Sequence, residues 1–304
     1  MRHSASKLPS LCLDSLWVAS TAEDWEKLTV NAPQNVGALQ SPPSHHRGAP
    51  NILSPMDSDS HEPHPFSVYC ELEGISASIS EARVLGTLGD SLGHLELVLL
   101  QFHYRYLEHG SNVGADPFCI EILWHLTFMT LFADINELEI SAGREGYEQS
   151  QRHSERTRAW ALSQNAQRCA IHGALILRKA EKIWIGAEPA IHVPRAMFYA
   201  ALIWYCYAEY GHSNADEGAM RNTEFPEFKQ LGISGQRVLF EAHGFKNARP
   251  TRLQSMVATG LHDLLGRMGH WEISRKFASL IIYMVYGDVQ GDYRDVINTP
   301  EKGG

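Results

Sequence analysis

Cysteine is scarce in this 304-residue chain, and its spacing excludes several classes of protein. The five cysteines are odd in number and form no C-x2-C pair; they are Cys12, Cys70, Cys119, Cys169 and Cys206. Structural zinc requires closely spaced pairs of ligands, so these residues cannot build a zinc finger. A disulfide framework is also not expected, and the pattern indicates a reducing intracellular compartment.

Long apolar runs and an excess of positive charge are missing as well. The uncharged apolar stretches at 197–207 and 277–286 are shorter than the ~20 residues that a bilayer requires. The N-terminal residues contain no apolar core of the kind that a secretory signal needs. With 26 Lys and Arg against 35 Asp and Glu, the chain carries a net charge of -9. We therefore expect no membrane association and no strongly basic nucleic-acid surface on this chain.

Motifs of the common enzyme classes do not occur. The chain has no phosphate-binding glycine loop, no GxSxG nucleophile elbow and no HExxH zinc motif. The nearest carboxylate cluster is Asp134, Glu137 and Glu139, whose spacing does not bring all three onto one helical face. Cys169 and His172 share a helical face, but no further metal ligands lie nearby, so we expect a core cysteine beside a core histidine. These observations predict that the chain is not an enzyme.

The composition divides the chain into an arm, a domain and a tail. Residues 31–65 are rich in Pro, Ser, His and Asn and have few apolar side chains. Such a segment cannot bury enough surface to offset the entropy of ordering it, so residues 1–65 are predicted to be a disordered N-terminal arm. Apolar residues at helical spacing predict an all-α, multi-helix domain over 66–287. Residues 288–304 are expected to form a loose C-terminal tail.

The stretch EPAIHVPRAMFYAALIWYCYAEYG, at 188–211, is the centre of this predicted domain. It is apolar on every side from 196 to 207, and a helix of that kind is buried all round. Pro194 suits a first helical turn. Further helices are expected at 80–88, 90–109, 117–140, 155–185, 251–268 and 271–286, with a polar loop at 144–154 and either helix or strand within 232–244.

Five residues are candidates for the lining of a ligand pocket between helices. They are Trp124, His125, His172, Arg195 and Trp204, chosen because polar or aromatic groups here lie beside apolar stretches. Ligand pockets in proteins are mostly apolar with a few polar groups. The alternative for each histidine is a buried core residue with one hydrogen-bond partner.

Three long segments resemble the fungal-specific transcription factor regulatory domain, often called the middle homology region. They are ILWHLTFMTLFADINELEISAGREG (122–146), RAWALSQNAQRCAIHGALILRKAEKIWIGAEPAIHVPRAMFYAALIWYCY (158–207) and LLGRMGHWEISRKFASLI (264–281). The most recognisable pieces are WH at 124–125, GRE at 143–145 and AIHVP at 190–194. The resemblance covers much of 66–286 and is nearest to the variety found beside C2H2 fingers, a binuclear zinc cluster or both.

The resemblance implies an all-α domain in a nuclear, sequence-specific RNA polymerase II regulator. Zinc in that family belongs to an N-terminal DNA-binding module, and this chain has no C-x2-C…H-x3-H finger and no six-cysteine cluster. We therefore expect no cofactor in this chain and contact with DNA only through a module that is missing from it. The chain is expected to be a fragment, a truncated gene model or a member without a DNA-binding part.

The hypothesis that follows is a regulatory part of a fungal RNA polymerase II transcription factor that does not itself contact DNA. Its expected partners are the transcription machinery or a co-regulator protein, a small-molecule effector and, as one assembly, a second copy of the chain. Its expected localisation is the nucleus. The alternatives are a helical enzyme acting on a hydrophobic metabolite and a scaffold or dimerisation module. The resemblance implies no catalytic residues.

Overall fold

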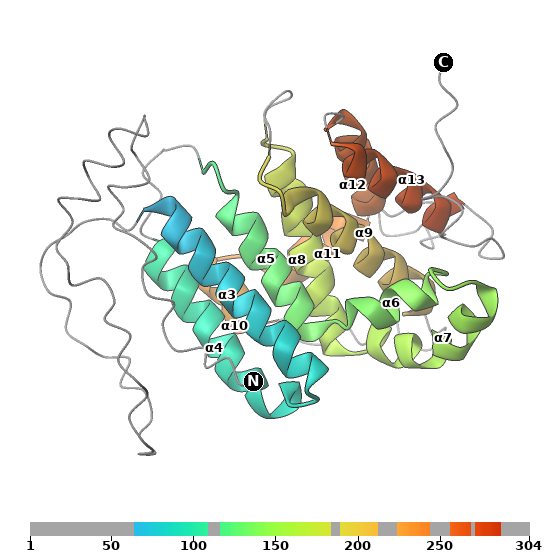
Figure 1. Ribbon diagram of the computed structural model, residues 1–304, viewed down its shortest axis with the longest axis horizontal. Helices are drawn as coiled ribbons and strands as arrows, with labels where there is room; N and C mark the ends of the chain where they lie inside the picture. Colours follow the sequence, from blue (N-terminus) through green and yellow to red (C-terminus); the bar gives the residue numbers. More distant parts are fainter. Residues whose placement is uncertain are drawn as a thin grey trace, which may run out of the picture. The chain divides into compact units, whose positions relative to one another are not determined.

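The computed structural model describes residues 64–108, 116–183, 189–211, 224–243, 256–268 and 271–286. These residues form helices and no strand, so the prediction of an all-α fold is confirmed for the described part of the chain (Figure 1). The helices are α3 Pro65–Val84, α4 Leu88–Tyr106, α5 Ile120–Phe132, α6 Ile135–Ser141, α7 Tyr147–Ala161, α8 Gln164–Ala180, α9 Val193–Tyr210, α10 Pro226–Gln230, α11 Gly235–His243, α12 Met256–Arg267 and α13 Glu272–Tyr286.

The chain divides into two compact units, Met1–Glu71 and Leu72–Gly304. Of the first unit the structure describes only residues 64–71, which include the first turns of α3. Nearly all of the predicted N-terminal arm and the whole predicted C-terminal tail lie outside the described residues. The architecture below is that of the second unit.

Helix α9 is the core of the second unit, as its all-round apolar sequence predicts. Twelve of its eighteen residues are buried. Helix α8 packs along it, and α5, α6, α7, α12 and α13 contact it as well. Pro194 stands in the first turn, where its missing N–H leaves no hydrogen bond unmade. Among the described residues, no helix combines the length and the apolar character needed to cross a bilayer.

A glycine allows α8 and α9 to approach each other closely. A Cβ atom on Gly173 of α8 would lie 3.1 Å from both Cδ1 and Nε1 of Trp204 on α9. The same indole nitrogen donates a hydrogen bond of 2.9 Å to the carbonyl oxygen of Ala170. The Trp204 ring is therefore held against the glycine, and the helix crossing depends on the absence of a side chain there.

The helix predicted over 117–140 is two helices, α5 and α6. The N-cap of the first one is Cys119, and the Asp116 carboxylate before it accepts hydrogen bonds from the backbone N–H groups of Phe118 (3.2 Å) and Ile120 (2.6 Å). The break falls at Ala133, whose backbone is extended, and Asp134 starts α6 by accepting from the N–H of Glu137 at 3.2 Å. Hydrophobic periodicity continues across this break, so it does not reveal that Asp134 caps a new helix.

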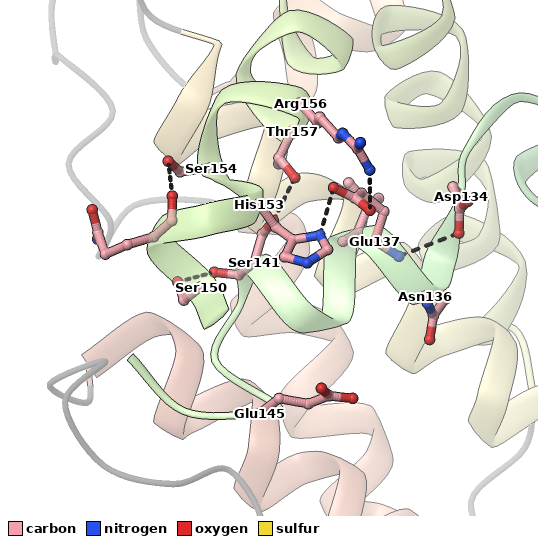
Figure 2. A network of polar contacts seen from close by, with 12 residues as sticks. Asp134, Asn136, Glu137, Ser141, Glu145, Ser150, His153, Ser154, Arg156 and Thr157 are labelled. Carbon is pink, nitrogen blue, oxygen red and sulfur yellow. Dashed lines mark hydrogen bonds and ion pairs between the residues drawn. The ribbon is translucent and has the colours of Figure 1, made fainter. Parts of the chain in front are cut away.

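The polar loop predicted at 144–154 is wrong, since residues 147–161 form α7. The side chains that α7 buries are small, and two of the three, Ser150 and Thr157, are hydroxylated, so they carry no hydrophobic period. Figure 2 shows them: Thr157 and Ser141 of α6 share a hydrogen bond of 2.6 Å, and Ser150 donates to the Ser141 carbonyl oxygen at 2.6 Å. The predicted helix at 155–185 also divides, because Ser163 caps α8.

The segment left undecided between helix and strand, 232–244, contains helix α11. It packs on α8, and its apolar residues Val238 and Leu239 are buried. Helices α12 and α13 lie against each other, as predicted, and both contact α9 (Figure 1, red).

Candidate functional site

The structure brings three of the five predicted pocket residues together and leaves two outside. Trp124 and His125 lie on α5, and His172 lies opposite them on α8. The ring centres of Trp124 and His172 are 5.8 Å apart. Trp204 instead covers Gly173 at the crossing of α8 with α9. Arg195 is exposed near the start of α9, where its positive charge acts on His192.

His125 and His172 form a fully buried pair. Their Nδ1 atoms are 2.8 Å apart, so one ring donates an N–H and the other accepts it. Burial lowers the pKa of both imidazoles, that of His125 most strongly, and the His172 ring lowers the pKa of His125 further. The pair is therefore neutral, with the two rings in complementary protonation states at Nδ1.

Beside this pair lies a buried ion pair that the sequence analysis did not predict. Arg168 of α8 donates from Nε and Nη2 to the two carboxylate oxygens of Glu227 on α10, each at 2.6 Å. Nη2 also donates to Oε1 of Glu96 on α4 at 2.7 Å. The side chain of Glu227 is 0% exposed and that of Arg168 is 6% exposed. One guanidinium thus connects three helices through charge-assisted hydrogen bonds.

The hydrogen bonds keep both members of the ion pair charged. Burial raises the pKa of the Glu227 carboxyl, but the adjacent His172 ring and the hydrogen bonds and positive charge of Arg168 outweigh burial and hold the pKa below its usual range. Burial likewise lowers the pKa of Arg168, and the two carboxylates more than reverse that effect.

Aromatic rings enclose the guanidinium. Its central carbon lies 4.0 Å from the ring centre of Phe132, 5.1 Å from that of Phe225 and 5.4 Å from that of Phe128. These distances are typical of cation–π interactions, which are strongest where water is excluded. The planar guanidinium is consequently fixed in orientation as well as in position.

His172 links the histidine pair to the ion pair. Its Nε2 atom is buried 3.4 Å from Oε1 of Glu227, outside hydrogen-bond geometry, and makes no hydrogen bond. Its ring also packs on Phe228, the neighbour of Glu227, with ring centres 4.8 Å apart. We call the group formed by His125, Arg168, His172 and Glu227 the buried polar cluster.

The buried polar cluster has the groups to recognise a carboxylate. A rigid guanidinium fork pairs with a carboxylate through two parallel hydrogen bonds, as Arg168 does here. Within the described ranges, no group of three or more His, Cys, Asp or Glu side chains is arranged to hold a metal ion.

The three carboxylates considered as an enzymatic cluster do not converge on one point. Asp134 caps α6, Glu137 binds Nδ1 of His153 at 2.8 Å, and Glu139 binds Arg144 at 2.5 Å (Figure 2 shows the first two). Each is used in a local contact between α6 and its surroundings. Cys169, similarly, donates to the carbonyl oxygen of Met129 at 3.7 Å and forms no dyad with His172.

Arg168 and Glu227 differ in how far the sequence could have indicated them. Arg168 lies four residues before His172 and next to Cys169, so a charge stands on the apolar face of α8, which is a usable signal. Glu227 has no such signal, because its partner is 59 residues away in the chain.

No family model, no curated protein and no solved structure matches this chain. The resemblance to the fungal regulatory domain accordingly rests on the segments quoted from the sequence.

Proposed function

We propose that this chain is the regulatory part of a fungal RNA polymerase II transcription factor, controlling transcription by binding an effector or a co-regulator. The observation that carries the proposal is the packing of the quoted segments. The pieces WH and AIHVP lie on α5 and at the start of α9, and α5, α8 and α9 pack on one another. The resemblance therefore concerns one packed core of an all-α unit.

Direct contacts join the pieces of the resemblance to that core. Nε2 of His192, within AIHVP, donates to the carbonyl oxygen of Cys119 at 3.2 Å and so connects the start of α9 to the start of α5. Arg144, within GRE, binds Glu139 at 2.5 Å and the Asn136 side-chain oxygen at 2.6 Å, which closes the turn after α6. Residues within the resembling pieces thus hold the helices of this unit together, which supports the proposal that the unit is a regulatory domain.

In this proposal the chain acts in the nucleus and meets DNA through a separate zinc-containing module. The effector site is the buried polar cluster with Trp124, because it unites three of the predicted pocket residues. The transcription machinery or a co-regulator protein reads the state of the domain. A second copy of the chain is a further proposed partner.

A tethering assay tests the proposal. The full chain is fused to an unrelated DNA-binding domain in a fungal host that carries a reporter gene, and transcription is compared with that of the DNA-binding domain alone. We expect the fusion to raise or lower reporter transcription several-fold and the tagged chain to accumulate in the nucleus. Equal transcription with the fusion and with the DNA-binding domain alone, at matched protein levels, would contradict the proposed function.

A further inference from the structure

Glu227, the carboxylate of the buried polar cluster, belongs to the shortest helix described. Helix α10 has five residues, too few for a helix that is stable by its own hydrogen bonds. It buries Glu227 completely and Phe228 to 1% exposure. Gln230 adds a hydrogen bond of 3.3 Å from its side-chain amide to the Leu100 carbonyl oxygen. α10 is thus held mainly by one carboxylate and one aromatic ring.

The receiving side of this contact belongs to long helices. Arg168 and His172 lie on α8, and Phe128 and Phe132 lie on α5. α5 and α8 pack closely on each other and on α9 without any contribution from α10. The guanidinium fork, the His172 ring and the aromatic walls of α5 therefore do not depend on α10 for their positions, and without α10 they would form a preorganised receptor.

The charges select the kind of anion that can replace Glu227. Arg168 contributes one positive charge, and Glu96 contributes a negative charge at 2.7 Å that stays when α10 leaves. A monocarboxylate restores the charge that Glu227 supplies. A phosphate would bring additional negative charge next to Glu96, which like-charge repulsion disfavours in a buried site.

Resting on the proposed regulatory function, we infer that the effector is a monocarboxylic acid with an aromatic group, which replaces Glu227 and Phe228 of α10. Its carboxylate binds Arg168 through the same two hydrogen bonds, and Nε2 of His172 gains a partner. Its ring takes the place of Phe228 against His172. Binding releases α10 from the core, so the occupied and empty states differ in the surface that a co-regulator meets.

The exchange is a competition between a free acid and a tethered one. A segment joined to its site by a short tether competes at an effective concentration in the millimolar range, so a simple aromatic acid acts on the wild-type chain at ~1–50 mM. Removing the tethered carboxylate lowers the concentration that is needed. The half-saturating concentrations for the wild-type chain and for the variant without this carboxylate are both measurable with the full chain and a defined probe, phenylacetate.

Hydrogen exchange at two backbone amides reports on α10. The N–H of Leu231 donates to the carbonyl oxygen of Glu227 at 2.9 Å, and that of Ile233 donates to Phe228 at 2.8 Å. We expect phenylacetate to accelerate exchange at both amides in a saturable way. Exchange at Ala196, whose N–H donates to His192 at the start of α9, is expected to stay unchanged.

Neutral and dianionic probes and two variants serve as controls. Phenylacetamide and phenyl phosphate, at equal ionic strength, are expected to leave Leu231 and Ile233 unchanged. Glu227→Gln is expected to lower the half-saturating phenylacetate concentration at least tenfold, which corresponds to at least about 1.4 kcal/mol. Glu224→Gln removes an exposed carboxylate from the same segment and is expected to behave like the wild type.

Each contrary result overturns the inference. Absence of a saturable change in the wild-type chain up to ~50 mM shows that Glu227 is a permanent structural group. An equal response to phenylacetamide shows that the carboxylate is not recognised, and an equal response to phenyl phosphate excludes the monocarboxylate class. The two proposals can fail separately. If phenylacetate releases α10 but the chain fused to a DNA-binding domain leaves reporter transcription unchanged, the binding site is supported and the proposed function is contradicted.

Discussion

At the scale of single residues, the ion pair of Arg168 and Glu227 places two charges in the interior of the unit. Two hydrogen bonds of 2.6 Å join groups that are almost fully removed from water. Burying such a pair costs solvation, so its net contribution to stability over an apolar pair is small. Breaking it by removing one partner is costly, because the other charge stays buried.

This asymmetry predicts the effect of Glu227→Gln. The variant keeps the shape of the side chain and removes its charge, while Arg168 keeps Glu96 as its remaining partner. We expect the free energy of unfolding to fall by about 2–4 kcal/mol, somewhat below the full cost of a broken buried pair because of that partner. Urea titration of the purified chain measures it.

Glu224→Gln is the matched control for this prediction. Its carboxylate is exposed, so the same chemical change is expected to alter stability by less than ~0.5 kcal/mol. If the two variants were equally stable, the buried ion pair would have no energetic consequence and the account of how α10 is held would be wrong.

At the scale of helices, the closest contact is the crossing of α8 with α9. Gly173 faces the Trp204 ring, which is buried and held by its hydrogen bond to Ala170. A Cβ atom at position 173 would lie 3.1 Å from the ring, so the ring or the helix behind it would have to shift. The crossing therefore transmits any change in α8 side-chain volume to the central helix.

Two glycine-to-alanine substitutions separate crowding from helix propensity. Gly93→Ala, on the exposed side of α4, meets no atom within 4 Å and is expected to stabilise the protein by about 0.5–1 kcal/mol. Gly173→Ala gains the same propensity but pushes Trp204 out of place, and we expect a net loss of about 1–3 kcal/mol. Thermal unfolding of both variants checks the opposite signs, and a stabilised Gly173→Ala protein would contradict the close crossing.

At the scale of the whole unit, several histidines are buried as neutral groups. Burial lowers the pKa of His103, His125, His172 and His192, and that of His192 falls from 6.5 to about 4. These four side chains are spread over four parts of the structure, from α4 to the start of α9. Their common effect is on the stability of the fold as a function of pH.

The sign of that effect follows from proton counting. A histidine with a lower pKa in the folded state binds fewer protons there than in the unfolded chain, so stability falls as the pH drops below 6.5. His192 alone accounts for a slope of up to about 1.4 kcal/mol per pH unit between 6.5 and about 4. The pKa of Glu227 is also lowered, so the stability from that group is present above its unfolded pKa of 4.5 and is lost as the pH falls below it.

We expect the free energy of unfolding to be nearly constant between about pH 8 and 7 and to decrease steeply from about pH 6.5 to 5. Urea titrations at a series of pH values measure the slope. His192→Gln keeps a hydrogen-bond donor near the Cys119 carbonyl oxygen and removes one titrating group, so its slope is expected to be smaller. A pH-independent stability in this range would contradict the neutral, buried state of these histidines.

Features that depend on neighbours along the chain were predictable. The apolar stretch in α9 required burial on all sides. The grouping of Trp124, His125 and His172 was also partly foreseen, because each stands within an apolar helical pattern. The first part of α7, 147–154, was predicted as a loop because its buried side chain, Ser150, is hydroxylated rather than apolar.

The sequence alone was sufficient for the helical class and for the central helix, since hydrophobic periodicity is a property of a short stretch of chain. Only the tertiary structure decided that Arg168 meets Glu227 and Glu96, across 59 and 72 residues of chain. Pairing at such separations depends on how the helices pack, and no local pattern encodes it. The buried polar cluster therefore emerges only when α4, α5, α8 and α10 come together.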